Sequence, residues 1–394
     1  MNVLLVDTNF SSIPIYESLI SWGCRVYLIG RNPNDFLAKN FPNYIEADYS
    51  DLKLLKNIIE DYQIQYIVPG CNDHSYQVCA ALSKESYTMN IDDLEKTNTL
   101  FNKKQFRDFC SKNKLPAPKS YTFDEICSDS LENQIIVKPV DAFSGKGVTR
   151  LSGQDIEALN QAVQYAKKSS KDGSCVIEEF VEGQLYSHTA FIVDGVIVKD
   201  FVVEEYGSVN PFVVDTSFLK ETFSELLLND IRENIANIAN LLELSDGLIH
   251  TQLIHGQGKY WLVEITRRCP GDLYSQLIEL STGFNYAEMY ASFFIGKKLP
   301  VNNKIEINKS IIRHTITQHH DGIFNYIHYK EPLKLERYIS IATNGDQLSP
   351  SPNGRIGILF VDVETELRKK DLIDKFISRQ VYDVEFAGIG ERYE

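Results

Sequence analysis

The chain lacks the sequence features of several common protein classes. It contains no run of about 18 or more apolar residues, so no membrane-spanning helix is expected. No basic stretch precedes its first apolar segment, so we expect no signal peptide. Its seven cysteines form no CxxC pair and no zinc-ligand spacing, which favours reduced thiols and a cytoplasmic protein.

Positive charge is also in the minority. The chain has 40 Lys and Arg against 54 Asp and Glu, for a net charge of -14, which argues against a nucleic-acid partner. The turn after the first strand, residues 7–12, has no GxGxxG pattern, so a dinucleotide site and a dehydrogenase function are disfavoured. No Ser-His-Asp or Cys-His arrangement and no biotin-carrier lysine motif is evident.

What the chain does contain is enough length, 394 residues, for two or three domains of about 150 residues each. Its first part alternates apolar strands with amphipathic helices. We expect strands at 3–7, 25–29 and 66–68, and helices at 11–22 and 52–62. This β-α-β-α-β order predicts a small parallel sheet with right-handed crossovers.

The pattern changes near residues 92–104. A helix is expected to start at 102 and to end before the proline-containing segment 115–118. Further along, strands are expected at 135–137, 175–177, 187–193, 196–203, 248–254 and 259–265, and helices at 155–168, 226–242 and 363–377. The last hundred residues alternate short strands with polar turns.

The most informative segment is Glu264-Ile265-Thr266-Arg267-Arg268. It follows the apolar run Tyr260–Val263, so a carboxylate and two guanidiniums lie at the end of a strand. A carboxylate can hold Mg²⁺, and an arginine can face phosphate oxygens. The combination therefore indicates a site for a metal-bound polyphosphate.

A second segment of the same kind begins at Lys138, which ends an expected strand. Ser144-Gly145-Lys146-Gly147-Val148 follows in a loop, where glycines let backbone N–H groups approach phosphate oxygens. A plain hairpin turn is the alternative for this segment, and the residues alone do not decide between the two.

Two further segments carry weaker signals. Glu178-Glu179-Phe180-Val181 follows a strand, where its acceptors suit an adenine amino group, although a solvated acidic turn is the simpler interpretation. Lys103 and Lys104 stand at the head of a helix, where cations oppose the helix dipole and a solvated surface is the default.

Along the chain, Lys103, then Lys138 with the loop 143–147, then the acidic segment 178–183, and finally Glu264 and Arg268 form an ordered set that resembles the ATP-grasp superfamily. The resemblance implies a mixed α/β and α+β chain, with a Rossmann-like N-terminal domain followed by a two-lobed ATP-grasp fold. The expected boundaries are 1–97 for the N-terminal domain, 98–300 for the ATP-grasp domain with its small lobe at about 110–185, and 301–394 for a C-terminal α+β part that completes the large lobe.

The resemblance also implies a role for each matching residue, with ATP and Mg²⁺ as cofactors. Lys103 and Lys138 would contact phosphates, and Glu264 would bind Mg²⁺ while Arg268 steadies the transferred phosphoryl group. Gly145, Lys146, Gly147 and Val148 would form a lid over the phosphates, and Ser144 would add a donor. Glu178 would accept from adenine, and the backbone of Glu179 and Val181 would frame the ring.

Three positions depart from the pattern of this family. Gln184-Leu185 stands where a glutamate for the ribose is common, Gln252 replaces the usual acidic metal ligand, and Thr266 replaces the usual asparagine. Gln252 and Thr266 can still offer oxygens beside Glu264, but the metal site has less negative charge. We therefore expect Mg²⁺ to depend more on the phosphates of the nucleotide.

The chemistry implied by the resemblance is a carboxylate–amine ligation, or occasionally a carboxylate–thiol ligation. A carboxylate attacks the γ-phosphate to give an acylphosphate and ADP, and an amine then displaces phosphate. An amino acid or a peptide-like molecule is the expected substrate, because the architecture resembles amino-acid ligases. A small-molecule kinase on the same fold and a non-catalytic ATP-binding module are the alternatives.

Substrate residues are the least constrained part of the prediction. Asp73 is a candidate to hold an amine and His74 to orient it, with an N-cap of the helix starting near Ser75 as the alternative. Arg267 is a candidate anchor for a substrate carboxylate. Expected partners are small carboxylates and amines, without nucleic acid or membrane, and a homodimer is the default assembly.

Overall fold

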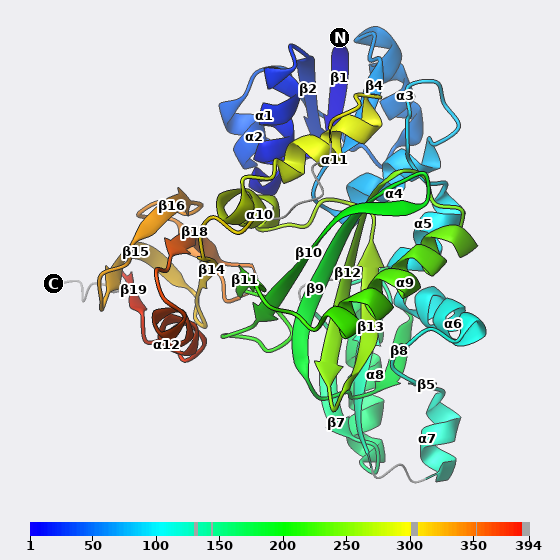
Figure 1. Ribbon diagram of the computed structural model, residues 1–394, viewed down its shortest axis with the longest axis vertical. Helices are drawn as coiled ribbons and strands as arrows, with labels where there is room; N and C mark the ends of the chain where they lie inside the picture. The colour runs from blue at the N-terminus through cyan, green and yellow to red at the C-terminus, as the bar shows by residue number, and fades with distance from the viewer. Residues whose placement is uncertain (130–132, 143–144, 301–305, 352, 388–394) are drawn as a thin grey trace, which may run out of the picture.

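The computed structural model describes residues 1–129, 133–142, 145–300, 306–351 and 353–387. Figure 1 shows three regions: an N-terminal unit at the top, a large sheet in the centre, and a small lobe at the bottom. Within the described ranges, no helix is both long enough and apolar enough to cross a lipid bilayer.

The N-terminal unit is built on a four-stranded parallel sheet in the order β3-β2-β1-β4. The inner strand β1 is apolar and almost completely buried, because helices cover both of its faces. The elements are β1 (Asn2–Val6), η1 (Phe10–Ser12), α1 (Ile13–Ser21), β2 (Arg25–Gly30), α2 (Phe36–Asn40), β3 (Tyr44–Glu46), α3 (Leu52–Asp61), β4 (Tyr66–Pro69) and α4 (Asp73–Ala81).

The small lobe is a four-stranded antiparallel sheet in the order β5-β8-β6-β7, with α8 packed on one face. Two helices, α5 and α6, connect it to the N-terminal unit. The elements are α5 (Leu94–Phe101), α6 (Lys103–Asn113), β5 (Ser120–Tyr121), α7 (Phe123–Asp129), β6 (Gln134–Pro139), β7 (Thr149–Ser152), α8 (Ile156–Ser169) and β8 (Cys175–Glu179).

The large sheet has eight strands in the order β13-β12-β9-β10-β11-β14-β18-β16. Its last three strands come from the C-terminal part of the chain, so that part completes the same layer. The elements are β9 (Gln184–Val193), β10 (Val196–Tyr206), β11 (Thr216–Leu219), α9 (Glu225–Leu241), β12 (Gly247–Gly256), β13 (Lys259–Thr266), β14 (Ile311–Thr317), β16 (Leu335–Ser340) and β18 (Arg355–Asp362).

A third sheet, in the order β17-β15-β19, packs beside this C-terminal end together with a helix. Its elements are β15 (Gly322–Tyr329), β17 (Gln347–Leu348), α12 (Glu366–Ile377) and β19 (Tyr382–Phe386). Two helices, α10 (Tyr274–Thr282) and α11 (Tyr286–Phe294), follow the end of β13 and lead back toward the N-terminal unit.

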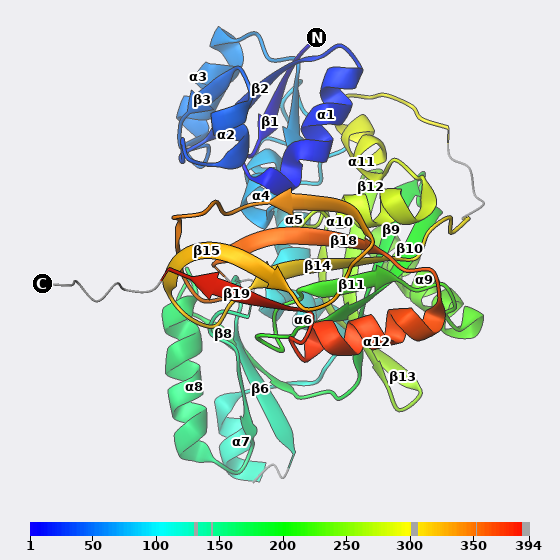
Figure 2. The same ribbon diagram turned by 90° about the vertical axis from the view of Figure 1, so that its left-hand side faces the viewer.

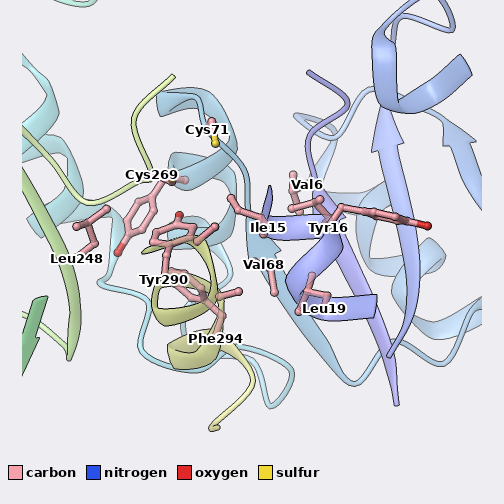
Figure 3. Close-up of a cluster of buried hydrophobic side chains, with 14 of the residues drawn as sticks. Val6, Ile15, Tyr16, Leu19, Val68, Cys71, Leu248, Cys269, Tyr290 and Phe294 are labelled. Carbon is pink, nitrogen blue, oxygen red and sulfur yellow. The ribbon is translucent and has the colours of Figure 1, made fainter. Parts of the chain in front are cut away.

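The helix α11 packs on the N-terminal unit although it lies far away in sequence. It contacts α1 and β4, and Tyr290 and Phe294 enter the same apolar cluster as Ile15, Leu19 and Val68 (Figure 3). This cluster is continuous with residues of the large sheet. Hydrophobic burial therefore joins the two regions into one body.

The sequence predicted this architecture well. The mixed α/β and α+β class is confirmed, and so is the parallel order of the three predicted N-terminal strands. A fourth strand, β3, and the short helix α2 had not been predicted. Both are too short to give a clear periodic pattern.

The enclosed carboxyl of Glu279 on α10 gives a pH-dependent prediction. Burial raises the pKa of Glu279 to about 7, above that of an exposed glutamate. The folded state therefore loses stability as the pH rises from about 4.5 to 7, because the charged form is disfavoured only in the folded protein. Glu279→Gln should raise the free energy of unfolding by roughly 2 kcal/mol at pH 8 and leave it nearly unchanged at pH 4.5.

Urea unfolding of both proteins at the two pH values measures this difference. Glu233→Gln, which removes an exposed carboxylate from the distant helix α9, is the control and should change stability by less than about 0.5 kcal/mol. A Glu279→Gln effect of the same size at both pH values would contradict the burial argument.

Candidate nucleotide and metal site

Two lysines of the predicted phosphate site are brought together by backbone contacts. Lys103 is the first residue of α6, and its N–H donates to the carbonyl of Val140, just after β6 ends. Its Nζ donates to the Ala142 carbonyl at 2.9 Å. Lys138 lies on the adjoining strand β6, so both cations stand at one end of the small lobe.

The carboxylate of Glu178 is held by cations in the interior of the protein. Its Oε2 accepts from Lys138 Nζ at 2.9 Å, and its Oε1 lies 2.7 Å from Nε of Arg107. Burial alone would raise the pKa of Glu178, but Lys138 and Arg107 bring it below its ordinary value. The side chain is completely buried and pairs with Arg107 and Lys138, and its role as an adenine acceptor stays a prediction.

Backbone groups after β8 remain suitable for an adenine ring. The backbone N–H of Glu179 donates to the carbonyl of Lys119, and the Glu179 carboxylate accepts from the backbone N–H of Lys119. The N–H of Phe180 donates to the carbonyl of Gln134. Within the part of the chain that the structure describes, the N–H of Val181 has no hydrogen-bond partner. It is therefore the donor best placed to frame a planar heterocycle.

The glycine loop adopts a conformation that larger residues would oppose. Gly145 and Gly147 have φ angles of +65° and +76°, and a Cβ on Gly147 would lie 2.6 Å from the Cβ of Ser169. Lys146 is exposed, and the N–H of Val148 closes a turn onto Gly145. The predicted residue Ser144 lies outside the described residues.

The candidate metal ligands meet across two neighbouring strands. Gln252 of β12 stands directly opposite Glu264 of β13, and Thr266 follows on the same strand. Glu264 is about one-third exposed, and its Oε2 lies 3.6 Å from Nζ of Lys103. Carboxylate, amide and hydroxyl oxygens are the donors that Mg²⁺ prefers, so this set fits the ion.

The donor set is nevertheless sparse. The described residues contain no group of three or more His, Cys, Asp or Glu side chains arranged to hold a metal ion. Mg²⁺ held by Glu264 would need oxygens from a bound polyphosphate to complete its coordination.

The two consecutive arginines after β13 have different roles. Arg268 donates from Nε to Asp73 of α4 at 2.7 Å, and its side chain is partly exposed. This contact brings the N-terminal unit to the edge of the site. Asn72 caps α4 by accepting from the N–H of Ser75, so the predicted cap is present beside Asp73.

Arg267 is not available to a substrate in this structure. Its guanidinium donates to Asp92 at 2.6 Å and to the carbonyls of Leu248 and Ser245, and the residue is only 2% exposed. All three nitrogens are therefore used inside the protein. The assignment of Arg267 as a carboxylate anchor is wrong, because its position is that of a structural ion pair.

His74 lies near the same edge, half-buried, with its ring 5.2 Å from that of Tyr49. Burial lowers the pKa of His74, and Lys171 lowers it further. The imidazole is therefore neutral at physiological pH and can accept a hydrogen bond.

The sequence interpretation did not single out Glu205, which belongs to a row of polar residues on the same face of the large sheet. Glu205 of β10 accepts from Nε2 of Gln252 at 2.8 Å and is 4% exposed. Farther along, Arg313 of β14 donates to Ser217 and to the carbonyl of Asp272. The glutamate pair that follows the apolar residues Phe201–Val203 of β10 was the signal in the sequence that pointed to this row.

Backbone strain marks the segment beside this row. Asp272 and Leu273 have φ angles of +53° and +55°, which cost non-glycine residues on the order of 1 kcal/mol each. The N–H of Asp272 binds Ser11 of the N-terminal unit, and Leu273 precedes α10. Contacts from three elements therefore hold an unfavourable conformation next to the candidate site.

Comparison with known proteins shows similarity to ATP-grasp proteins for part of the chain. Residues 131–276 match the ATP-grasp domain family. The chain is 25% identical to phosphoribosylamine–glycine ligase of Pyrococcus furiosus over 224 residues, which is 54% of this chain and 51% of that protein. It thus spans about half the length of the curated relatives that it matches.

Solved structures show that the fold similarity covers nearly the whole chain. An L-amino acid ligase from Bacillus licheniformis has a TM-score of 0.78 at 16% identity, over 98% of this chain and 99% of that one. A biotin carboxylase domain from Hydrogenobacter thermophilus, solved with MgADP, has a TM-score of 0.77 at 11% identity, over 98% and 90% of the two chains. The match of residues 131–276 confirms the resemblance to ATP-grasp proteins for that domain, and the solved structures add a shared fold over nearly the whole chain.

The buried ion pairs of Glu178 give a prediction for stability. Glu178→Gln would leave Arg107 and Lys138 buried without a carboxylate, and removing one partner of a buried pair costs about 3–5 kcal/mol. Urea unfolding of the purified variant should show a loss of this size.

Glu179→Gln is the matched control, because it changes the next residue to the same amide on the surface side of β8. It should cost less than about 1 kcal/mol. Equal losses in the two variants would contradict the assignment of Glu178 as the central buried charge.

Proposed function

Because the chain contains an ATP-grasp domain, we propose that it is an ATP-dependent ligase that joins a carboxylate to an amine and releases ADP and phosphate. The relatives that support this are phosphoribosylamine–glycine ligases, and the similar structures include an L-amino acid ligase. The activities in the names of these relatives support an amino acid or a peptide-like small molecule as the substrate.

The observation that carries the proposal is the contact between Lys103 and Glu264. A cation from the first turn of α6 lies 3.6 Å from the candidate metal carboxylate at the end of β13. The same Nζ binds the carbonyl of Ala142, close to the glycine loop. Phosphate-binding cation, metal ligand and loop thus converge, although they are spread over about 160 residues of sequence.

The proposed cofactors are ATP and Mg²⁺. When bound, Mg²⁺ supplies neutralisation of the phosphate charge. Glu264 would hold the ion, with Gln252 and Thr266 as neutral oxygen donors on the neighbouring positions. Lys103 would then exchange its contact with Glu264 for contacts with phosphate oxygens.

The reaction needs no nucleophile from the protein. An oxygen of the substrate carboxylate attacks the γ-phosphorus, the bond to the β–γ bridging oxygen breaks, and ADP leaves. An amine nitrogen then attacks the carbonyl carbon of the acylphosphate, the carbon–oxygen bond to phosphate breaks, and the nitrogen loses a proton. Lys138 and Arg268 would hold the reacting groups in line and offset their negative charge.

Asp73 and Arg268 would connect catalysis to the N-terminal unit. Only Nε of Arg268 is bound to Asp73, and Nη1 makes a long contact of 3.4 Å with the carbonyl of Cys269. The outer edge of the guanidinium is therefore left for a phosphoryl or acyl oxygen. Asp73 and the neutral imidazole of His74 would face the amine side.

The decisive experiment measures ADP and inorganic phosphate released from MgATP with pools of amino acids and other small carboxylates and amines. Wild-type protein should release the two products in equal amounts, and only when a pool is present. Glu264→Ala should lower the rate by at least about a hundredfold, because it removes the charged metal ligand.

Glu225→Ala is the control, since it removes an exposed carboxylate on α9 and should leave the rate unchanged. ADP without phosphate would identify a kinase instead of a ligase. ATP binding without turnover in any pool would identify a binding module. Full activity of Glu264→Ala would contradict the metal assignment.

A further inference from the structure

Gln252, which stands where a charged metal ligand was expected, is directly tied to a carboxylate from another strand. Its Nε2 donates to Oε2 of Glu205 at 2.8 Å. Gln252 belongs to β12 and Glu205 to β10, with β9 between them in the sheet. On its other side Gln252 faces Glu264 of β13.

This contact fixes which end of the amide faces the candidate metal site. A carboxylate can only accept hydrogen bonds, whereas an amide has a donor end and an acceptor end. Nε2 must therefore be the end that meets Glu205, and Oε1 is left for the side of Glu264. An amide free to rotate would present either end, and its NH₂ group would repel a cation.

Glu205 also contributes charge. It is 4% exposed, and among the described residues no Lys, Arg or His makes an ion pair with it. The Ser187 hydroxyl lies close to it and also contacts the hydroxyl of Tyr274 at 3.0 Å. Its hydrogen-bond donors are neutral, and the Arg313 cation attracts it only from a distance beyond an ion pair. A buried carboxylate of this kind is costly, and a cation bound nearby would offset that cost.

We propose that Glu205 is a positioning residue for the metal: it holds the Gln252 carbonyl toward Glu264 and supplies the negative charge that position 252 lacks. The inference rests on the proposed function, because it concerns the Mg²⁺ of that site. The carboxylate of the usual second ligand is thus displaced two strands along the sheet, and the amide transmits its effect to the metal.

The test measures metal binding without turnover. Mn²⁺ replaces Mg²⁺, ADP is present, and electron paramagnetic resonance of free Mn²⁺ gives the affinity. Glu205→Gln should weaken binding by about tenfold, because it removes the negative charge and, with a donor end as well as an acceptor end at 205, no longer fixes the orientation of the Gln252 amide. Glu205→Asp should do the same, because its shorter side chain withdraws the carboxylate but keeps the charge.

A swap of the two residues distinguishes positioning from general damage. In Glu205→Gln/Gln252→Glu, the carboxylate stands at 252 and an amide at 205 still donates to it, so affinity should return to within about threefold of wild type. An unchanged affinity in Glu205→Gln, or a double variant no better than Glu205→Gln, would overturn the proposal.

Glu204→Gln is the control from the same strand. Glu204 points to the other face of β10, where it pairs with Lys220 at 2.6 Å, so its replacement should leave Mn²⁺ affinity unchanged. Glu264→Ala separates the two proposals. Binding that is lost in Glu264→Ala but intact in Glu205→Gln removes only the inference, whereas a wild-type protein that binds no Mn²⁺ with ADP contradicts both.

Discussion

The buried carboxylate of Glu178 is the interaction on which the arrangement of the site depends. It joins β8 to Lys138 of β6 and to Arg107 of α6, and Arg107 also donates to the carbonyl of Val263 in β13 at 2.6 Å. One charged centre therefore links the small lobe to the strand that carries Glu264. The separation between Lys138 and Glu264, the candidate phosphate and metal residues, therefore depends on this centre, in which Glu178 and Arg107 are buried.

Charged contacts also hold the other side of the site. Arg267 and Arg268 are adjacent in sequence but pair with different partners. Arg267 pairs with Asp92, just before α5, and Arg268 pairs with Asp73, the first residue of α4. The first arginine fixes the end of β13 in the interior, and the second presents a guanidinium at the edge. Adjacent arginines thus differ in burial: Arg267 is enclosed in the protein, and Arg268 is partly exposed.

The sequence predicted what depends on local pattern. Each strand end, the glycine loop and the cluster at Glu264 is a continuous stretch of sequence, so its pattern can be recognised directly. The periodic segments predicted the fold class. The burial of Arg267 could not be predicted, because its partner Asp92 lies 175 positions away. The contact between Glu205 and Gln252 was missed for the same reason: their register is set by the intervening strand β9. Local spacing names candidate residues, but tertiary contacts decide which are free.

The return of α11 to the N-terminal unit bears on how such chains can diversify. Trp22 donates to Glu288, and Tyr290 and Phe294 fill the space beside α1 and β4, so the N-terminal fold is completed by a segment from beyond the catalytic core. Recombination that exchanged only the first hundred residues would separate two halves of one apolar core. Evolution of this architecture is therefore constrained to change both segments together, and its N-terminal unit is not a portable module.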